Sequence, residues 1–194
     1  MSYRPITDTW ILARPKVRYY GAYPSGFLER ARALLGVSID DAVLHVCGGK
    51  VRDYPFRGFG PNDRTVDADP ALAPDYVRQV GKDPLPAPLD VGLSEPDLWY
   101  GWPAVLADPP YTEADAAKYA PGVEAFPTAG RVLRACLEVV RPGGRVGILH
   151  YAIPRPPKGA RFVACVGVFV GFDNRMRAYS VFERPADEPG GAAR

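Results

Sequence analysis

Short apolar runs alternate along this chain with segments of helical periodicity, and this alternation constrains the fold more than any other feature. The runs AVLHVCGG (42–49), PAVLADPPY (103–111) and RVGILHY (145–151) have the length and composition of buried strands. Residues 24–36 and 127–144 carry apolar side chains at helical spacing, and each segment closes on glycine. Alternating strands and helices predict an α/β domain with a mostly parallel sheet.

Two further short strands are predicted at 64–70 and within 76–86, and the end of the chain predicts an antiparallel hairpin. The arms of the hairpin are RFVACVGVFVGF (161–172) and RMRAYSVFER (175–184), which are rich in apolar and β-branched residues. The first twenty residues are mixed, aromatic and basic, and no element is predicted for them.

The composition is that of one folded domain. A chain of 194 residues can bury a full core, and 47% apolar residues exclude a disordered chain. We expect a single domain over residues 1–184 and a disordered tail over residues 185–194. The three cysteines lack the spacing of a disulfide framework or of a metal site, so no metal is expected. No segment resembles a signal peptide or a membrane span, which predicts a soluble, cytoplasmic protein.

The formal net charge of +2 conceals an uneven distribution of charge along the chain. Residues 1–61 carry a net charge of +4, residues 62–124 carry −8, and residues 125–184 carry +7. Basic flanks around a carboxylate-rich centre suit a site that uses carboxylates and has a polyanion as its partner. An ordinary uneven distribution of surface charge, without any function, would give the same net charges for the three segments.

Polar residues gather where the predicted strands end. Gly48 and Gly49 follow the first strand, Asp67 ends the second, Asp83 follows the third, and Asp108 ends the fourth. In open parallel sheets, ligands bind beyond the carboxyl ends of the strands. We therefore expect these residues to meet at one edge of the sheet.

Asp108-Pro109-Pro110-Tyr111 is the most informative motif. Its two prolines remove two backbone donors and fix two φ angles, so the Asp108 carboxylate and the neighbouring carbonyls are held rigidly. A planar amine needs two acceptors for its hydrogens and a face for stacking, which a carboxylate, a backbone carbonyl and Tyr111 provide. The motif indicates a site that holds an amine so that its nitrogen can act as a nucleophile. The alternative is a turn that only ends the strand.

The glycine turn of LHVCGG, the acid in TVDADP and the DPPY motif together resemble the class I S-adenosylmethionine-dependent methyltransferases. More narrowly, they are similar to amino-methyltransferases with an (Asp/Asn/Ser)-Pro-Pro-(Tyr/Phe) motif, among them bacterial and phage DNA adenine-N6 and cytosine-N4 methyltransferases. The resemblance covers residues 20–184. It implies a Rossmann-like methyltransferase sandwich and S-adenosylmethionine as the cofactor.

The resemblance also implies roles for single residues. Asp67 would accept the ribose hydroxyls of the cofactor, Asp83 its adenine amine, and Asp108 through Tyr111 would grip the target amine. The first strand and its turn would pass beneath the methionine part of the cofactor, at His45, Cys47, Gly48 and Gly49.

Simpler readings stand beside several of these roles. Asp69 suits a helix N-cap, and Asp83 can be an ordinary loop aspartate. His45 and His150 lie in apolar strands, which favours satisfied core histidines. Residues 21–27 suit either a segment that closes over the methionine end of the cofactor or a capped helix start.

Two basic segments suit contact with nucleic acid. Arginines and lysines next to aromatic rings can bind phosphates and stack on bases, although solvated surface charge is the default for any one of them. The candidate residues are Arg14, Lys16 and Arg18, which lie near tyrosines, and Arg155, Lys158 and Arg161, which surround a proline-rich loop.

The leading hypothesis is methyl transfer to an exocyclic amine of a nucleic-acid base, first of all adenine N6 in DNA. An RNA base, a protein glutamine amide and a non-catalytic binding module remain alternatives, and a Rossmann dinucleotide oxidoreductase fits less well. The chain is too short for a separate target-recognition region. Recognition of the target base sequence would then depend on the loops 50–63, 84–102 and 152–160, on the second subunit of a homodimer, or on a separate recognition subunit.

Overall fold

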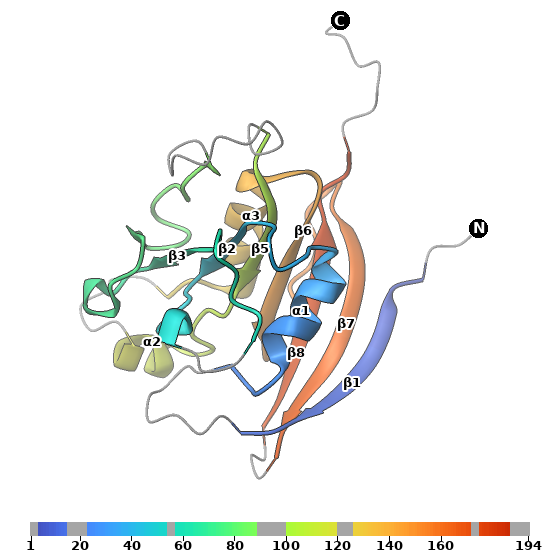
Figure 1. Cartoon of the computed structure of the whole chain (residues 1–194), viewed down its shortest axis with the longest axis horizontal. Helices are drawn as coiled ribbons and strands as arrows, with labels where there is room; N and C mark the ends of the chain where they lie inside the picture. The colour runs from blue at the N-terminus through green and yellow to red at the C-terminus, as the bar shows by residue number, and fades with distance from the viewer. Residues whose placement is uncertain are drawn as a thin grey trace, which may run out of the picture.

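One mixed sheet forms the centre of the protein in a computed structural model of the chain (Figure 1). The strands, in chain order, are β1 (Ile6–Leu12), β2 (Val43–Val46), β3 (Arg64–Asp67), β4 (Tyr76–Val77), β5 (Trp102–Ala107), β6 (Val140–His150), β7 (Arg161–Val170) and β8 (Met176–Glu183). The helices are α1 (Phe27–Leu35), α2 (Glu113–Tyr119) and α3 (Ala129–Val139), with short 3₁₀ turns η1 (Val51–Asp53) and η2 (Pro70–Leu72). The described residues are 4–14, 23–53, 57–88, 100–119, 126–171 and 175–186.

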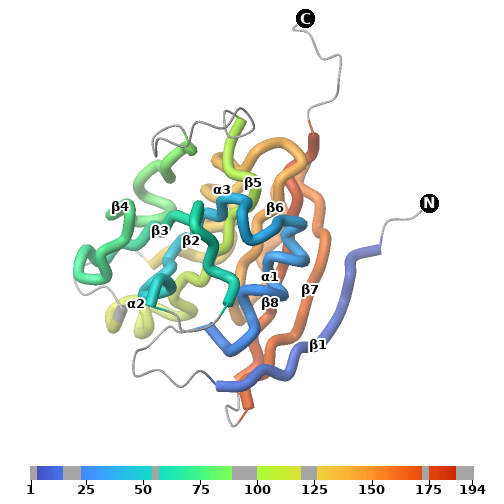
Figure 2. Tube along the Cα trace, viewed as in Figure 1, coloured from blue at the N-terminus to red at the C-terminus, as the bar shows by residue number. Residues whose placement is uncertain are grey.

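The order of the strands across the sheet is β1-β7-β8-β6-β5-β2-β3-β4, with β1 and β4 at its two edges (Figure 2). Strands β2, β3, β4, β5 and β6 pair in parallel, as do β1 and β7, whereas β8 runs antiparallel between β6 and β7. The predicted mostly parallel α/β sheet with a C-terminal antiparallel hairpin is therefore confirmed.

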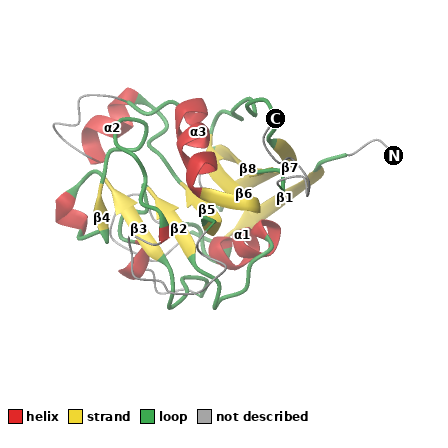
Figure 3. Cartoon of the chain, turned by 90° about the horizontal axis from the view of Figure 1, so that it is seen from above, coloured by secondary structure: helices red, strands yellow, loops and turns green. Residues whose placement is uncertain are grey.

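The two faces of the sheet bury separate apolar clusters, because successive residues of a strand point to opposite sides. Helix α1 covers one face, where Phe27 packs with Leu106 and Tyr179. Helix α3 covers the other face, where Leu133 packs with Ile148. Figure 3 shows α1 and α3 on opposite sides of the strands. The sandwich leaves the carboxyl ends of the central strands as the edge at which polar side chains can gather.

Helix α1 begins and ends close to the predicted positions. Phe27, Leu28, Ala31 and Leu35 form its buried stripe. Gly36 follows with a φ of 74° and donates its N–H to a carbonyl of the last turn, a conformation that glycine adopts without steric penalty.

Helix α3 ends at Val139, ahead of the stop that Pro142 and Gly143 predict within the segment 127–144. Val140 already pairs with Trp102 of β5, so the chain enters β6 at this point and tertiary pairing overrides the Pro-Gly stop signal. The guanidinium of Arg184 donates to the carbonyl of Val140 at 2.8 Å, which satisfies a backbone acceptor at this junction.

Strand β1 lies in the first twenty residues, where no element was predicted. Trp10 and Leu12 point into the core, and Ile11 between them is 80% exposed. Trp10 packs against Phe27 and Tyr179, so the strand is stabilised by one buried face. In the described part of the chain, no helix is both long and apolar enough to cross a membrane.

Candidate functional site

The carboxyl ends of β2, β3 and β5 meet at one edge of the sheet, and backbone hydrogen bonds join them. The N–H of Cys47 donates to Val66 at 2.8 Å, and the N–H of Asp108 donates to Val46 at 3.2 Å. The glycine turn therefore lies between the end of β3 and the DPPY motif, as the strand-end rule predicts.

The turn after β2 is shaped by left-handed backbone at Cys47, with a φ of 55°, and at Gly49, with a φ of 52°. A side chain at Gly48 would crowd His45, since its Cβ would lie 3.2 Å from the Cβ of His45. Among the described residues, no heavy atom lies within 4 Å of the place where a Cβ at Gly49 would be. The turn thus leaves room for a ligand to approach the backbone at Gly49.

Asp67 is fixed beside this turn by backbone donors. Its carboxylate accepts from the N–H of Gly49 at 3.0 Å and from the N–H of Asp69 at 3.1 Å. Burial raises the pKa of Asp67 and outweighs the effect of these donors, which lower it. The N–H of Ala68 is a third backbone donor to this carboxylate. A carboxylate has about four lone-pair sites, so Asp67 can still accept from a hydroxyl group of a ligand.

Asp69 has the simpler role proposed for it. Its side chain accepts from the N–H of Ala71 at 2.9 Å and caps the short turn η2, which begins at Pro70. Asp69 is therefore a capping residue, and Asp67 is the acid that lies at the glycine turn.

The DPPY motif brings Asp108 and Tyr111 into direct contact. The Tyr111 hydroxyl donates to Oδ1 of Asp108 at 2.7 Å, and within the described residues Oδ2 has no hydrogen-bond partner. Burial raises the pKa of Asp108 to about 6, and the positive charge of Arg177 and the Tyr111 hydroxyl oppose this rise. Asp108 is therefore mainly an ionised acceptor at pH 7, and it becomes protonated in mild acid.

Three further side chains surround the Tyr111 ring. The guanidinium of Arg177 lies 5.7 Å from the ring centroid, within the range of a cation–π contact. The ring of Tyr151 lies 4.5 Å away, and the ring of His150 lies 5.3 Å away and perpendicular to it. Arg177 and Tyr151 are not among the residues predicted for the site. Arg177 lies near His150 only through the register of β8 against β6, which the sequence does not reveal.

Cys47 lies close to both carboxylates of this edge. Burial raises the pKa of the Cys47 thiol well above its usual range, and the charges of Asp67 and Asp108 raise it further. The thiol is therefore neutral and a poor nucleophile. Cys47, Cys136 and Cys165 are all free thiols.

His45 lies in the core beneath the turn. Its Nε2 lies 3.0 Å from a carboxylate oxygen of Asp63, and its side chain is 1% exposed. Asp63 also accepts two hydrogen bonds from Arg32, at 2.5 and 2.6 Å, and backbone N–H groups from Val43 and Gly60. Burial would raise the pKa of Asp63, but His45 and Arg32 together lower it. His45 is thus a buried core histidine that is paired at Nε2, while its Nδ1 has no hydrogen-bond partner within the described residues. Contact of His45 with a cofactor stays a prediction.

Asp83 belongs to a local turn after β4. Its carboxylate accepts from the N–H of Gln79 at 2.8 Å, which matches the loop-aspartate alternative. The structure does not bring Asp83 into contact with Asp67 or the glycine turn, so its role at a cofactor stays a prediction.

The basic candidates lie at the surface where they are described. Arg14, Arg155, Lys158 and Arg161 are exposed, and Arg161 forms an ion pair with Glu183. Lys16 and Arg18 lie outside the described residues, as do parts of the segment 21–27 and of the loops 50–63 and 84–102, and residues 187–194 of the predicted tail.

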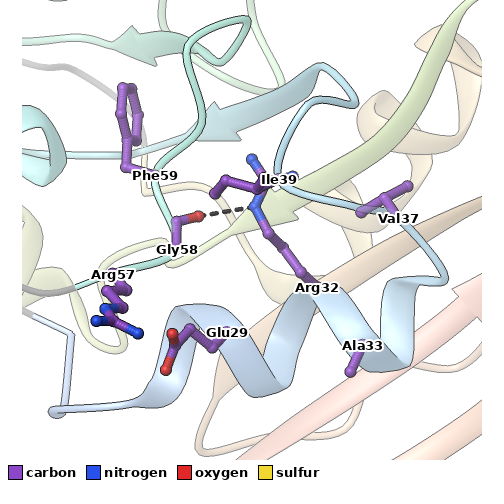
Figure 4. Close-up of a pocket in the computed structure, with 8 residues that line it drawn as sticks. All are labelled: Glu29, Arg32, Ala33, Val37, Ile39, Arg57, Gly58 and Phe59. Atoms are coloured by element: carbon purple, nitrogen blue, oxygen red, sulfur yellow. Dashed lines mark hydrogen bonds between the residues drawn. The ribbon is translucent and has the colours of Figure 1, made fainter.

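A hollow of about 470 Å³ lies away from the strand ends, between α1 and residues 57–59 (Figure 4). Arg32 lines the hollow, and its Nε donates to the carbonyl of Gly58 at 2.7 Å. The Arg32 guanidinium already donates to Asp63 and to the carbonyls of Gly58 and two other residues, so it is held in place as a structural group of this hollow. Among the described residues, no cluster of three or more histidine, cysteine or acidic side chains can hold a metal ion.

This chain resembles known proteins in its three-dimensional structure and not in its sequence. No protein-family model and no curated protein match the sequence. The crystal structure of TrmN from Thermus thermophilus is 17% identical with a TM-score of 0.55, over 85% of this chain and 50% of TrmN. This chain thus spans half the length of TrmN. A likeness at this identity shows a shared fold.

Two other solved structures match with lower TM-scores. An rRNA methylase from Streptococcus thermophilus is 11% identical over 81% of this chain and 95% of its own, with a TM-score of 0.45. The N-methyltransferase NodS from Bradyrhizobium japonicum WM9, in complex with S-adenosyl-L-homocysteine, is 11% identical over 81% of this chain and 86% of its own, with a TM-score of 0.47. The chain shares with TrmN a Rossmann-like α/β fold with a mostly parallel sheet.

Proposed function

We propose that this protein is an S-adenosylmethionine-dependent methyltransferase that acts on an exocyclic amine of a nucleic-acid base, with adenine N6 in DNA as the first candidate. The observation that carries the proposal is the meeting of two elements at one sheet edge. The glycine turn with Asp67 lies on one side, and Asp108 with Tyr111 lies on the other. A fold shared with TrmN and a DPPY motif at the end of β5 support the same reading.

The residues at the glycine turn fit the cofactor. Among the described residues, nothing lies within 4 Å of a Cβ placed on Gly49, and the Asp67 carboxylate would accept the ribose hydroxyls. Cys47 and Gly48 would lie beneath the methionine part, with His45 behind them, and Asp83 would reach the adenine amine. When bound, S-adenosylmethionine supplies a methyl group activated by its positive sulfur.

Asp108 and the carbonyl of Pro109 would accept the two hydrogens of the target amine, while the Tyr111 ring stacks on the base. Holding both N–H groups turns the nitrogen lone pair toward the methyl group. The bound cofactor would supply the methyl group for the new nitrogen–carbon bond and leave as S-adenosyl-L-homocysteine, and the methylated nitrogen would release its proton to solvent. Positioning supplies much of the rate, and a base within a duplex would first be flipped out of the helix.

Nucleic acid would contact the basic surface beside this site. Arg155, Lys158 and Arg161 lie on and next to the loop after β6, whose first residue is Tyr151. Arg14, Lys16 and Arg18 form the second basic segment. Phosphate contacts of this kind confer affinity without sequence information, so a second copy of the chain or a separate subunit would read the target sequence.

The test is transfer of a labelled methyl group from S-adenosylmethionine to mixed DNA and mixed RNA, followed by identification of the modified base. We expect Asp108→Ala to lower the transfer rate by at least about 100-fold, because the amine loses its charged acceptor. Asp40→Ala, which changes an exposed aspartate far from the site, is the matched control and is expected to keep full activity.

Full transfer by a folded Asp108→Ala variant would contradict the proposed mechanism. If calorimetry detected no binding of S-adenosylmethionine to the wild-type protein, a non-catalytic binding module would be the better description.

A further inference from the structure

His150 carries a hydrogen-bond donor whose position is fixed by the fold. It is the last residue of β6 and is 6% exposed. Its Nδ1 accepts the N–H of Ala152 at 2.9 Å, so in the neutral ring the proton is on Nε2. Burial lowers the pKa of His150, which keeps the ring neutral at pH 7. The side chain therefore presents one N–H donor at Nε2.

The Nε2 atom of His150 is buried. Within the described residues, Nε2 of His150 has no hydrogen-bond partner. A buried unpaired donor costs about 1–3 kcal/mol, and such exceptions in native proteins call for an explanation such as a ligand site. The neighbour that distinguishes His150 from an ordinary core histidine is Tyr111, whose ring stands perpendicular to the imidazole at 5.3 Å.

Tyr111 covers an acceptor and a donor at the same time. Its hydroxyl is bonded to Asp108, and its ring lies against His150. Asp108 follows β5 and His150 ends β6, and these strands are neighbours in register, with Ala107 beside Ile148. Asp108 and His150 both contact Tyr111, so a charged acceptor side chain and a neutral donor side chain lie at the ends of adjacent strands.

We propose that His150 is a specificity-determining residue, whose Nε2–H donates to the ring nitrogen bonded to the amine-bearing carbon of the acceptor base. Asp108 accepts from the amine at the same time, once Tyr111 turns aside to stack on the ring. This inference rests on the proposed function and narrows its substrate class. Adenine, with its N6 amine beside N1, and cytosine, with its N4 amine beside N3, present a donor–acceptor pair of this kind. In guanine the N2 amine lies between a donor at N1 and an acceptor at N3, so guanine would match this pair only along its N3 side.

A glutamine amide also pairs an amine with an acceptor, but the surroundings favour a planar ring. Tyr111 and Tyr151 lie 4.5 Å apart between centroids, and Arg177 lies over Tyr111. Aromatic and guanidinium groups of this kind stack on bases of any sequence. A small amide would leave most of this surface without a partner.

The test compares His150→Phe, which removes the donor, with His150→Gln, whose amide N–H can take the place of Nε2–H. Methyl transfer is measured on single-stranded DNA and RNA oligonucleotides that contain either the natural base or its analogue without the ring nitrogen. The analogues are 1-deazaadenine for adenine and 3-deazacytosine for cytosine. Oligonucleotides with 7-deazaadenine, which keeps N1, serve as the matched substrate control. Circular dichroism and thermal unfolding show whether each variant folds.

We expect the wild-type protein to lose about tenfold in kcat/KM on the 1- or 3-deaza substrate and little on the 7-deaza control, because only the former leaves the His150 donor unpaired. His150→Phe is expected to lose about tenfold on the natural base and nothing further on its analogue. His150→Gln should recover most of the wild-type preference. This pattern is a coupling between one side chain and one substrate atom, and a purely structural role of His150 would not produce it.

Equal ratios of natural to deaza rates in the wild-type and His150→Phe proteins would overturn the inference and leave the proposed function standing. Transfer to a glutamine peptide in place of the oligonucleotides would overturn the choice of a base. No transfer to any oligonucleotide or peptide by the wild-type protein would overturn the proposed function itself, and this inference with it.

Discussion

Asp108→Asn is expected to stabilise the folded protein at neutral pH while it impairs methyl transfer. Burial raises the pKa of Asp108 from its usual 3.8 to about 6, so the folded state binds this proton more tightly than the unfolded chain does. The ionised carboxylate therefore destabilises the folded state. This effect is absent below pH 3.8, grows as the pH rises toward 6, and is complete above it.

The size of the effect follows from the two pKa values. Each pKa unit corresponds to about 1.4 kcal/mol, so the change from 3.8 to about 6 amounts to about 3 kcal/mol. Because the Asp108 side chain keeps some contact with solvent, we expect about 1–3 kcal/mol in practice. The asparagine amide has no charge at any pH and can still accept the Tyr111 hydroxyl, so it avoids this penalty.

The assay is urea unfolding at several pH values between 4 and 7.5, followed by the fluorescence of the buried Trp10 and Trp102. The free energy of unfolding of the variant minus that of the wild-type protein should rise by about 1–3 kcal/mol over this range. For Asp40→Asn, an exposed aspartate, the same difference should stay constant. A difference for Asp108→Asn that is flat with pH, or that falls as the pH rises, would refute the reasoning.

Three further substitutions test other parts of the site and its support, each by urea unfolding. Cys47→Gly should stabilise the protein by about 1 kcal/mol, because glycine adopts the left-handed φ of 55° without strain, and unchanged or lower stability would contradict this. Asp63→Asn should destabilise by about 3–5 kcal/mol, because Arg32 then keeps a buried charge without a counterion, and a loss below about 1 kcal/mol would speak against it. Gly147→Ala should destabilise by about 1–3 kcal/mol, since the new Cβ would lie 2.3 Å from the Tyr179 hydroxyl oxygen, and a neutral effect would show that Tyr179 can move.

Much of the fold was predictable from the sequence, because the elements that build it are strongly periodic. The apolar runs at 42–49, 103–111 and 145–151 each overlap a central strand. The meeting of Asp67 with the glycine turn followed from the rule that parallel strands bring their carboxyl ends to one edge. This part of the prediction depended on patterns within single segments, which a sequence displays directly.

The rest depended on partners that are distant in the chain. Asp63, 18 positions away, turns His45 into a core residue. Arg177 reaches Tyr111 only through the register of β8 against β6, which no local pattern reveals. Strand β1 alternates in burial only at Trp10, Ile11 and Leu12, too short a stretch to identify a strand beforehand.

The pairing of β1 with β7 also determines when the protein can finish folding. Ile6 pairs with Ala164, so the first strand to leave the ribosome must wait for a partner made near the end of synthesis. At about 5–20 residues per second, the intervening roughly 150 residues take about 8–30 seconds to appear. During that interval the indole of Trp10 has neither β7 nor Tyr179 to pack against, and β1 can meet another nascent chain instead. Completion of the sheet is thus coupled to translation of its last hairpin.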